Sequence, residues 1–365
     1  MIDMFTTSVS DDAVNIVNET LKSTFISSGK KADKFEDRLK IFDLIRPVTV
    51  NSGTSALHLA LASAGISEGD EVILPSQTFI ATGLTILHQK ATPVFADINY
   101  MSGNISPESI REKITDKTKA IMVVHWAGYP CDMDEIQLIA DEHNLIVIED
   151  AAHAFGSWYK DRPIGSISDY TCFSFQAIKM LTTGDGGAVC SLTDENEKHL
   201  KKLRWFNIDR DDDKSDELGE RVYNSNEIGY KYHMNDVSAS IGIGNLYTVG
   251  GKLKRYKEIT GKYRETLHNI EGITLFENKS DRISSNWLFG MHVDCRDDFI
   301  KKMKDNGITT SVVHLGIDKN DLFGGKDESL INQRKFDNSQ IHIPIHDDLS
   351  NKDVDKIINT IKSGW

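Results

Sequence analysis

The sequence predicts an α/β fold, with a large N-terminal domain built on a mostly parallel sheet and a smaller C-terminal α+β domain. Short β-rich segments alternate with helical segments from residue 47 onward, which is the pattern of βαβ units. The alternation ends near residue 245, within a long helical stretch over residues 235–268. We therefore place the large domain in residues 1–245 and the small domain in residues 246–365.

The expected elements follow one another in a regular order. Two helices come first, over residues 11–24 and 31–42. The expected strands cover residues 47–50, 71–74, 92–96, 120–124 and 145–148. The helices between them cover residues 54–64, 79–89, a segment that begins at Pro107 with Ser106 as its N-cap, and 133–143. The strand at residues 121–124 is apolar throughout, which is expected of a strand that is buried on both faces.

Composition excludes several classes of function. The 365 residues include 42 basic and 55 acidic side chains, a net charge of −13, which argues against binding to nucleic acid or to an anionic membrane. The four cysteines form no CxxC pair, so neither a disulfide framework nor a zinc or other metal site is expected. The start lacks the pattern of a signal peptide, and no apolar run approaches the ~18 residues of a membrane span. We expect a cytoplasmic protein.

One segment is strongly charged. Residues 209–217 read Asp-Arg-Asp-Asp-Asp-Lys-Ser-Asp-Glu, which predicts a solvated loop. The spacing does not match a calcium-binding loop, because no Gly follows the first acidic positions.

Small polar residues lie between the first strand and the helix that follows it. The sequence Asn51-Ser-Gly-Thr54-Ser55 places hydroxyl groups and a glycine at a helix N-terminus, where backbone amides can bind a phosphate. The same residues also suit capping of the helix without any ligand, which is the commoner use of Ser and Thr at this position. This motif alone therefore leaves both interpretations open.

Two further motifs carry chemically useful side chains. Asp150 stands at the carboxyl end of a strand, the edge at which open α/β sheets bind ligands, although it could instead cap a following helix. Lys179 leaves an apolar stretch and enters the Gly-rich turn at residues 182–187. Burial there would lower the pKa of the lysine and raise its nucleophilicity. The alternative is a lysine that extends from a helix end into solvent.

Together these motifs match what pyridoxal 5′-phosphate (PLP) requires: a phosphate cradle, an acid for the pyridinium nitrogen and a Schiff-base lysine. Their order resembles the sugar aminotransferases of the DegT/StrS type, which are fold-type I PLP enzymes and include the perosamine synthases. The resemblance covers nearly the whole chain. Its most specific motifs are Asn51-Ser-Gly-Thr-Ser-Ala-Leu-His-Leu-Ala-Leu61, Gly69-Asp-Glu-Val-Ile-Leu-Pro-Ser-Gln-Thr-Phe79, Ile148-Glu-Asp-Ala-Ala-His153, Phe173-Ser-Phe-Gln-Ala-Ile-Lys179, Thr182-Thr-Gly-Asp-Gly-Gly187 and Gly229-Tyr-Lys-Tyr-His-Met-Asn235.

The resemblance implies a role for each matching residue. Lys179 would form the internal aldimine and later move the proton between Cα and C4′. Asp150 would keep the pyridine nitrogen protonated, and His153 would lie beside the cofactor near its 3′-oxygen. Phe79 would stack on the pyridine ring. The phosphate would be held by Thr54, Ser55 and Ser174.

The chain departs from the family pattern at three places. Lys231-Tyr-His233 replaces the usual Asn-Tyr-Arg, whose Asn reaches the cofactor phosphate of the other subunit; Lys231 would act there as a point charge. Asp185 replaces the usual Glu and is one methylene shorter. The usual His-Gly after the helix at residues 195–205 is missing, and this loop lies near the active site in relatives, so the substrate stays open.

The implied reaction moves an amino group from L-glutamate to a keto sugar. A nucleotide-linked 4-keto-6-deoxy sugar is expected first, for a surface polysaccharide such as the lipopolysaccharide O-antigen. A keto sugar without a nucleotide, or a cyclitol, stays open as an alternative. A PLP-dependent sugar dehydratase is disfavoured because those relatives replace the lysine with a histidine. The intact pair of Asp150 and Lys179 also disfavours a non-catalytic binding protein.

The resemblance also implies partners. Because active sites in this family span two subunits, we expect a homodimer, with small-molecule substrates and neither nucleic acid nor membrane as a partner. Lys30 and Lys31, beside the Ser-Ser-Gly at residues 27–29, are candidates for the phosphates of a sugar nucleotide. They could instead mark an exposed helix start.

Overall fold

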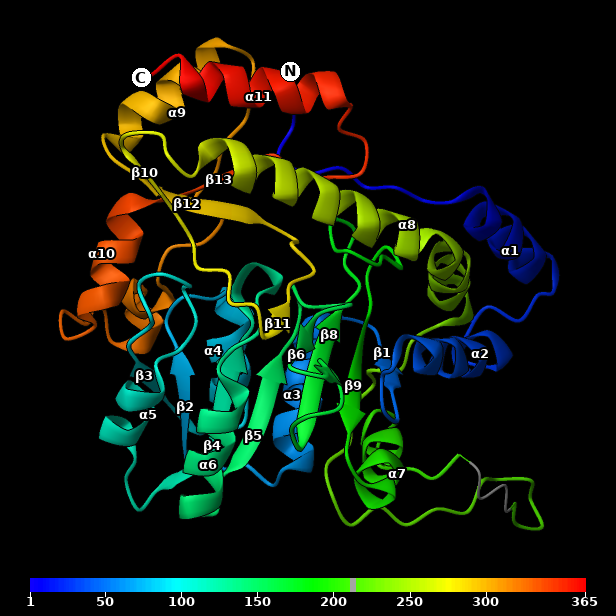
Figure 1. The fold of residues 1–365 in the computed structure, drawn as a ribbon. Helices are drawn as coiled ribbons and strands as arrows, with labels where there is room; N and C mark the ends of the chain where they lie inside the picture. Colours follow the sequence, from blue (N-terminus) through cyan, green and yellow to red (C-terminus); the bar gives the residue numbers. More distant parts are fainter. Residues whose placement is uncertain (211–214) are drawn as a thin grey trace.

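The computed structural model describes residues 1–210 and 215–365 and places a seven-stranded sheet at the centre of the large domain (Figure 1). The strand order is β1-β9-β8-β5-β4-β2-β3, and β9 alone runs against its neighbours in this sheet. The strands are β1 (Val48–Val50), β2 (Glu71–Pro75), β3 (Thr92–Ala96), β4 (Thr118–Val124), β5 (Ile146–Asp150), β8 (Tyr170–Ser174) and β9 (Gly187–Ser191). The expected mostly parallel sheet is confirmed.

Helices cover both faces of this sheet (Figure 1). Those of the large domain are α1 (Asp11–Lys22), α2 (Lys30–Leu39), α3 (Gly53–Ser63), α4 (Ile80–His88), α5 (Pro107–Lys113), α6 (Met133–His143) and α7 (Asp194–Leu203). Capping fixes several starts: Ser106 accepts from the amide of Ser109, as predicted for α5, and Thr193 accepts from Asn196 in α7. The predicted helix over residues 31–42 is shorter, because α2 ends at Leu39 and a 3₁₀ turn follows.

The described residues also form four further α-helices, one of them much longer than the others, and two small sheets, one of which takes two strands from residues 158–163. They comprise α8 (Asp236–Leu267), α9 (Arg296–Asp305), α10 (Ile331–Ser339) and α11 (Asn351–Lys362), a sheet of β10 (Ile273–Leu275), β12 (Phe289–Val293) and β13 (Gln340–Ile343), and a sheet of β6 (Trp158–Tyr159), β7 (Arg162–Pro163) and β11 (Arg282–Ile283). The helix α8 runs unbroken through residue 245, so the division at that residue stays a prediction.

The core explains why the central helix and strands are so apolar. In β4, all residues from Ala120 to Val124 are buried, as expected for a strand covered on both faces. In α3, residues 55–61 are all buried, so this helix is enclosed on every side rather than amphipathic. A rigid α3 fixes the position of its own N-terminus, which reaches the cavity described below.

The charged segment at residues 209–217 is only partly described. Asp209 forms an ion pair with Lys202, with a nitrogen–oxygen distance of 3.2 Å. Arg210 and residues 215–217 are exposed, whereas residues 211–214 lie outside the described part of the chain. Among the helices of the described residues, none combines the length and the apolar character that crossing a membrane requires.

Candidate active site

A cavity of about 460 Å³ opens at the carboxyl edge of the large sheet. Open α/β sheets bind ligands at this edge. Its walls combine the N-terminus of α3, the ends of β5 and β8, the loop after β2 and parts of the small domain. The residues expected from the sequence that line it are Thr54, Phe79, Asp150, His153, Ser174 and Lys179, together with Asp185 of the Gly-rich turn.

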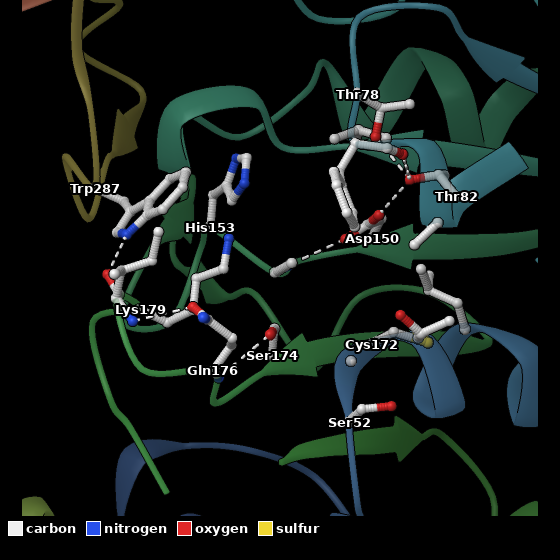
Figure 2. Close-up of a pocket in the computed structure, with 18 of the residues that line it drawn as sticks. Ser52, Thr78, Thr82, Asp150, His153, Cys172, Ser174, Gln176, Lys179 and Trp287 are labelled. Carbon is white, nitrogen blue, oxygen red and sulfur yellow. Dashed lines mark hydrogen bonds between the residues drawn. The ribbon is translucent and has the colours of Figure 1, made fainter. Parts of the chain in front are cut away.

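Lys179 lies in the turn that follows β8, and its amine enters the cavity (Figure 2). Its Nζ lies 3.8 Å from the centroid of the Trp287 ring. The Trp287 ring is fixed in turn, because its Nε1 donates to the carbonyl oxygen of Ile178 at 2.9 Å. Lys179 therefore does not extend from a helix end into solvent, and that alternative is wrong.

Burial lowers the pKa of Lys179 from 10.5 to about 7, although the nearby carboxylate of Asp150 partly offsets the effect. A large fraction of the amine is therefore neutral near pH 7, whereas an ordinary lysine is almost wholly protonated there. Neutral amine is the form that attacks a carbonyl carbon. The site thus supplies a nucleophile at physiological pH.

The lowered pKa predicts how cofactor capture depends on pH. The rate at which the protein without cofactor captures added PLP should rise with pH as the amine loses its proton, and it should level off above about pH 8. Stopped-flow absorbance in the visible range measures this rate. A rate that still rises steeply above about pH 9 would mean that Lys179 titrates like an exposed lysine.

Asp150 ends β5 and turns its carboxylate into the cavity. Its Oδ2 accepts a hydrogen bond from Thr82 Oγ1 at 2.8 Å, and its Oδ1 accepts from the amide of Ala152 at 3.1 Å. Figure 2 shows Thr82 holding Asp150 on one side of the cavity, with Lys179 on the other. No helix begins at residues 151–157, so the helix-capping alternative for Asp150 is wrong.

Burial raises the pKa of Asp150 above 3.8, and the hydrogen bonds from Thr82 and from the Ala152 amide oppose this effect. Burial of an ionised carboxylate costs free energy of folding unless a cation lies beside it. The carboxylate would be stabilised by a ligand that presents a protonated nitrogen. The environment of Asp150 therefore suits the protonated pyridine nitrogen of PLP.

The N-terminus of α3 forms the opposite wall. Ser52 caps the helix by accepting from the Ser55 amide at 3.0 Å, while Gly53 and Thr54 line the cavity. A Cβ atom at Gly53 would lie 2.8 Å from Ser174 Cβ, so only glycine lets Ser174 approach the helix start this closely. Ser55 Oγ is instead bonded to Asn51 at 2.6 Å and is not among the residues that line the cavity.

Three other expected residues are placed as follows. The His153 ring stacks on Trp287 with centroids 4.0 Å apart, and its Nδ1 is buried without a partner in the described chain. Phe79 remains 53% exposed, which is high for a phenylalanine at a cavity wall. Lys231 is exposed and lies outside the cavity, with its Nζ 5.3 Å from the centroid of the Trp205 ring.

The departures from the family pattern have local consequences. The amide of Phe206 donates to Tyr230, which pairs the loop after α7 with the segment that carries Lys231. Phe206 and Asn207 both have positive φ values, 58° and 55°, in the loop after α7. A Cβ atom at Gly229 would lie 1.9 Å from the Asn207 nitrogen, so this crossing requires a glycine.

The N-terminus of α2, beside Lys30 and Lys31, is already occupied. Asp236 accepts hydrogen bonds from the amides of Gly29 at 2.8 Å, Lys31 at 3.2 Å and Ala32 at 3.1 Å. These three amides cannot bind a phosphate at the same time. The Lys31 amine pairs loosely with Glu19 at 3.7 Å, while Lys30 is exposed. Any phosphate contact here would involve the side chains alone.

Several cavity residues had no signal in the sequence motifs. They are Phe5, Thr82, Trp287, Ser311, Val313 and His314. Phe5 comes from the N-terminal segment, and Trp287, Ser311, Val313 and His314 come from the second half of the chain. Thr82 could have been found as the residue one turn beyond Phe79 in α4. The others become neighbours only through the packing of the two halves.

The residues present fit PLP. Four features face one cavity: a partly neutral lysine amine, a buried carboxylate, the start of α3 with Ser174 beside it, and the unpartnered Nδ1 of His153. Each has a counterpart in the cofactor: the aldehyde, the pyridine nitrogen, the phosphate and the ring oxygen. The fit rests on the arrangement of this site and not on one motif.

Comparison with known proteins agrees with this geometry. A sequence profile of the DegT/DnrJ/EryC1/StrS aminotransferase family matches residues 8–362, nearly the whole chain. The chain belongs to this family. The spore coat polysaccharide biosynthesis protein SpsC of Bacillus subtilis strain 168 is 37% identical over 97% of this chain and 94% of its own length. GDP-perosamine synthase of Escherichia coli O157:H7 is 34% identical over 99% of this chain and 97% of its own length.

Solved structures of the family have the same fold. The sugar aminotransferase CalS13 of Micromonospora echinospora has a TM-score of 0.95 and 31% identity, with full coverage of both chains. The putative sugar aminotransferase Spr1654 of Streptococcus pneumoniae, solved in its PLP form, has a TM-score of 0.91 and 29% identity, covering 99% of this chain and 98% of its own. The expected fold, the aminotransferase activity and the PLP cofactor are confirmed; this DegT/DnrJ/EryC1/StrS protein is a sugar aminotransferase.

Proposed function

We propose that this aminotransferase moves an amino group from L-glutamate to a nucleotide-linked 4-keto-6-deoxy sugar for the synthesis of a surface polysaccharide. The observation that carries the proposal is the placement of Lys179 and Asp150 in one cavity with the start of α3. The relatives named as GDP-perosamine synthase and as a spore coat polysaccharide protein support the choice of sugar and pathway class.

PLP supplies the electron sink that lets a proton leave the carbon bearing the substrate nitrogen. Lys179 would hold the cofactor. Once released, its amine would take that proton from Cα and return it to C4′, the carbon on the cofactor side of the nitrogen. A pKa of about 7 suits this exchange, because the amine can accept and donate a proton at neutral pH. Trp287, 3.8 Å from Nζ, limits where the amine can move.

The other residues position the cofactor. Asp150, held by Thr82 at 2.8 Å, keeps the proton on the pyridine nitrogen. His153 forms a hydrogen bond with the ring oxygen of the cofactor through its Nδ1, which has no other partner in the described chain. Phe79 packs on the ring face. The phosphate is held by the backbone amide and hydroxyl group of Thr54 and by the hydroxyl group of Ser174, whereas the Ser55 amide is already used by Ser52.

We also propose a cytoplasmic homodimer in which Lys231 serves the other subunit. Lys231 is exposed and lies outside the cavity of its own chain, whose lining includes no arginine and no lysine besides Lys179 among the described residues. A cofactor phosphate carries two negative charges, and the helix start offsets only part of that charge. A lysine from the second subunit would complete the neutralisation as a point charge.

Mixing two variants tests this arrangement. Lys179→Ala and Lys231→Ala, each alone, should give weak or inactive dimers. Unfolded and refolded together, they should form mixed dimers in which one of two sites is intact, so activity should return to as much as about a quarter of wild type. If Lys231 served its own chain, one site of the mixed dimer would lack Lys179 and the other would lack Lys231, and mixing would restore nothing.

The proposed reaction is tested with both substrates present. L-glutamate and a nucleotide-linked 4-keto-6-deoxyhexose are incubated with the PLP-loaded protein, and mass spectrometry follows the sugar. The proposal predicts replacement of the ketone oxygen by an amine and an equal amount of 2-oxoglutarate. If L-glutamate is consumed only with a keto sugar that carries no nucleotide, or with a cyclitol ketone, the activity class stands and the proposed acceptor is wrong.

A further inference from the structure

One cavity wall carries a histidine to which the proposed function assigns no role. His314 lines the cavity beside Ser311 and Val313, all from the segment between α9 and α10. Its backbone is held in place, because the side-chain Nε2 groups of Gln77 and Gln340 donate to its carbonyl oxygen at 3.0 and 2.8 Å. The position of the ring is therefore set by the fold.

The His314 ring is free to bind a ligand. It packs against Phe79 with centroids 5.2 Å apart and against the edge of Trp126 at 5.9 Å. Neither ring nitrogen has a hydrogen-bond partner within residues 1–210 and 215–365. Burial and the nearby Lys179 lower the pKa of His314 to about 4, so the ring is neutral at physiological pH. A neutral imidazole offers one donor and one acceptor.

Most neighbouring groups on this wall cannot do the same. Phe5 and Val313 are apolar, and Phe5 stacks on Trp287 with centroids 5.5 Å apart. The indole nitrogen of Trp287 is already used by Ile178 at 2.9 Å. Ser311 Oγ accepts from the amide of Val313 at 2.9 Å. His314 is thus the aromatic side chain of this wall that can bind a ligand through both ring nitrogens, while Ser311 keeps its hydroxyl proton and one lone pair for a second contact.

We propose that His314 binds a ring hydroxyl group of the sugar and so sets specificity in the sugar half-reaction. The inference rests on the proposed function. A neutral donor and acceptor match a hydroxyl group, which both gives and takes a hydrogen bond, better than a carboxylate or phosphate, which needs a cation. L-glutamate carries no hydroxyl group, so the donor half-reaction does not need this contact.

The test separates the two half-reactions. His314→Phe keeps a ring that can pack on Phe79 and removes both nitrogens, while His314→Gln keeps one donor and one acceptor. The PLP-loaded protein is mixed either with L-glutamate or with GDP- and dTDP-linked 4-amino-4,6-dideoxyhexoses, which run the sugar half-reaction in reverse. Loss of the visible absorbance of the lysine-bound cofactor gives the rate and the half-saturating concentration for each.

We expect His314→Phe to lower the ratio of rate to half-saturating concentration for the sugar by about 10- to 100-fold, the cost of one lost polar contact. The glutamate half-reaction should stay within about 2-fold, and His314→Gln should recover part of the sugar effect. Equal losses in both half-reactions would indicate a merely structural role and would overturn the inference.

Two other outcomes are distinguishable. If wild type and His314→Phe convert the amino sugar equally well, the inference is wrong and the proposed function stands. If wild-type protein reacts with L-glutamate but with none of the amino sugar nucleotides, the proposed acceptor is wrong, and the assignment of His314 falls with it.

Discussion

Lys179→Ala should abolish the visible absorbance of the bound cofactor and lower the rate of transamination by about 10⁴-fold or more. The reason is that the variant loses both the nucleophile that holds PLP and the base that moves the proton. No other lysine lines the cavity among the described residues, so no neighbour can take over. Absorbance spectra and single-turnover rates with L-glutamate measure the two effects.

A control separates this loss from damage to the fold. Lys90 is exposed and does not line the cavity. Its amine forms a loose ion pair with Glu68 at 3.8 Å. Lys90→Ala should therefore keep the spectrum and the rate of wild type. Lys179→Ala should unfold near the wild-type temperature, since a buried amine with a lowered pKa does not stabilise the native state. Transamination at the wild-type rate by Lys179→Ala would contradict the proposed mechanism.

Asp150→Asn should bind PLP but lower the rate by about 10²- to 10³-fold, the size expected when one charged group that stabilises the reacting state is removed. The asparagine oxygen can still accept from the Ala152 amide, and its NH2 group can donate to Thr82 Oγ1 in place of the reverse bond, so the geometry should persist. The asparagine cannot hold a proton on the pyridine nitrogen, because it carries no negative charge. Single-turnover rates with L-glutamate measure the loss.

The stability of the same variant gives an independent check. Burial raises the pKa of Asp150, so the ionised carboxylate destabilises the protein without cofactor at neutral pH, where the unfolded chain ionises this group more readily. Asp150→Asn should therefore match or exceed wild type in unfolding temperature before PLP is added. Thr82→Val offers a graded comparison, because it leaves the carboxylate in place and removes its 2.8 Å hydrogen bond, together with the contacts of the same hydroxyl group to Thr78 and to the Phe79 carbonyl. Unchanged turnover in Asp150→Asn would remove Asp150 from its assigned role.

The sequence could predict the fold of the first half because its signals are local. The alternation of strands and helices places Asp150 at the end of a strand, β5, and the apolar stretch before Lys179 contains the neighbouring strand β8. Their shared cavity then follows from sheet topology, since the carboxyl ends of parallel strands meet at one edge. Motif order was sufficient to predict these residues, and it also predicted the cofactor that the family comparison confirms.

The rest of the cavity could not be predicted in this way. Phe5 and Trp287 stack on one another although 282 positions separate them, a difference of 287 − 5. Their contact depends on how the N-terminal segment and the small domain pack on the sheet. His314 is fixed by Gln77 and Gln340, which are likewise distant in sequence. No short motif encodes such neighbours, because each contact is set by the packing of whole elements.

The absorbance spectrum of the purified protein, recorded before and after addition of L-glutamate, tests the central claim most directly. PLP held by Lys179 should give a visible band, and L-glutamate should replace it with a near-ultraviolet band as the amino group passes to the cofactor. A nucleotide-linked keto sugar should then restore the visible band. No visible band, even after PLP is added in excess, would contradict the assignment of Lys179. A band that L-glutamate leaves unchanged would contradict L-glutamate as the amino donor.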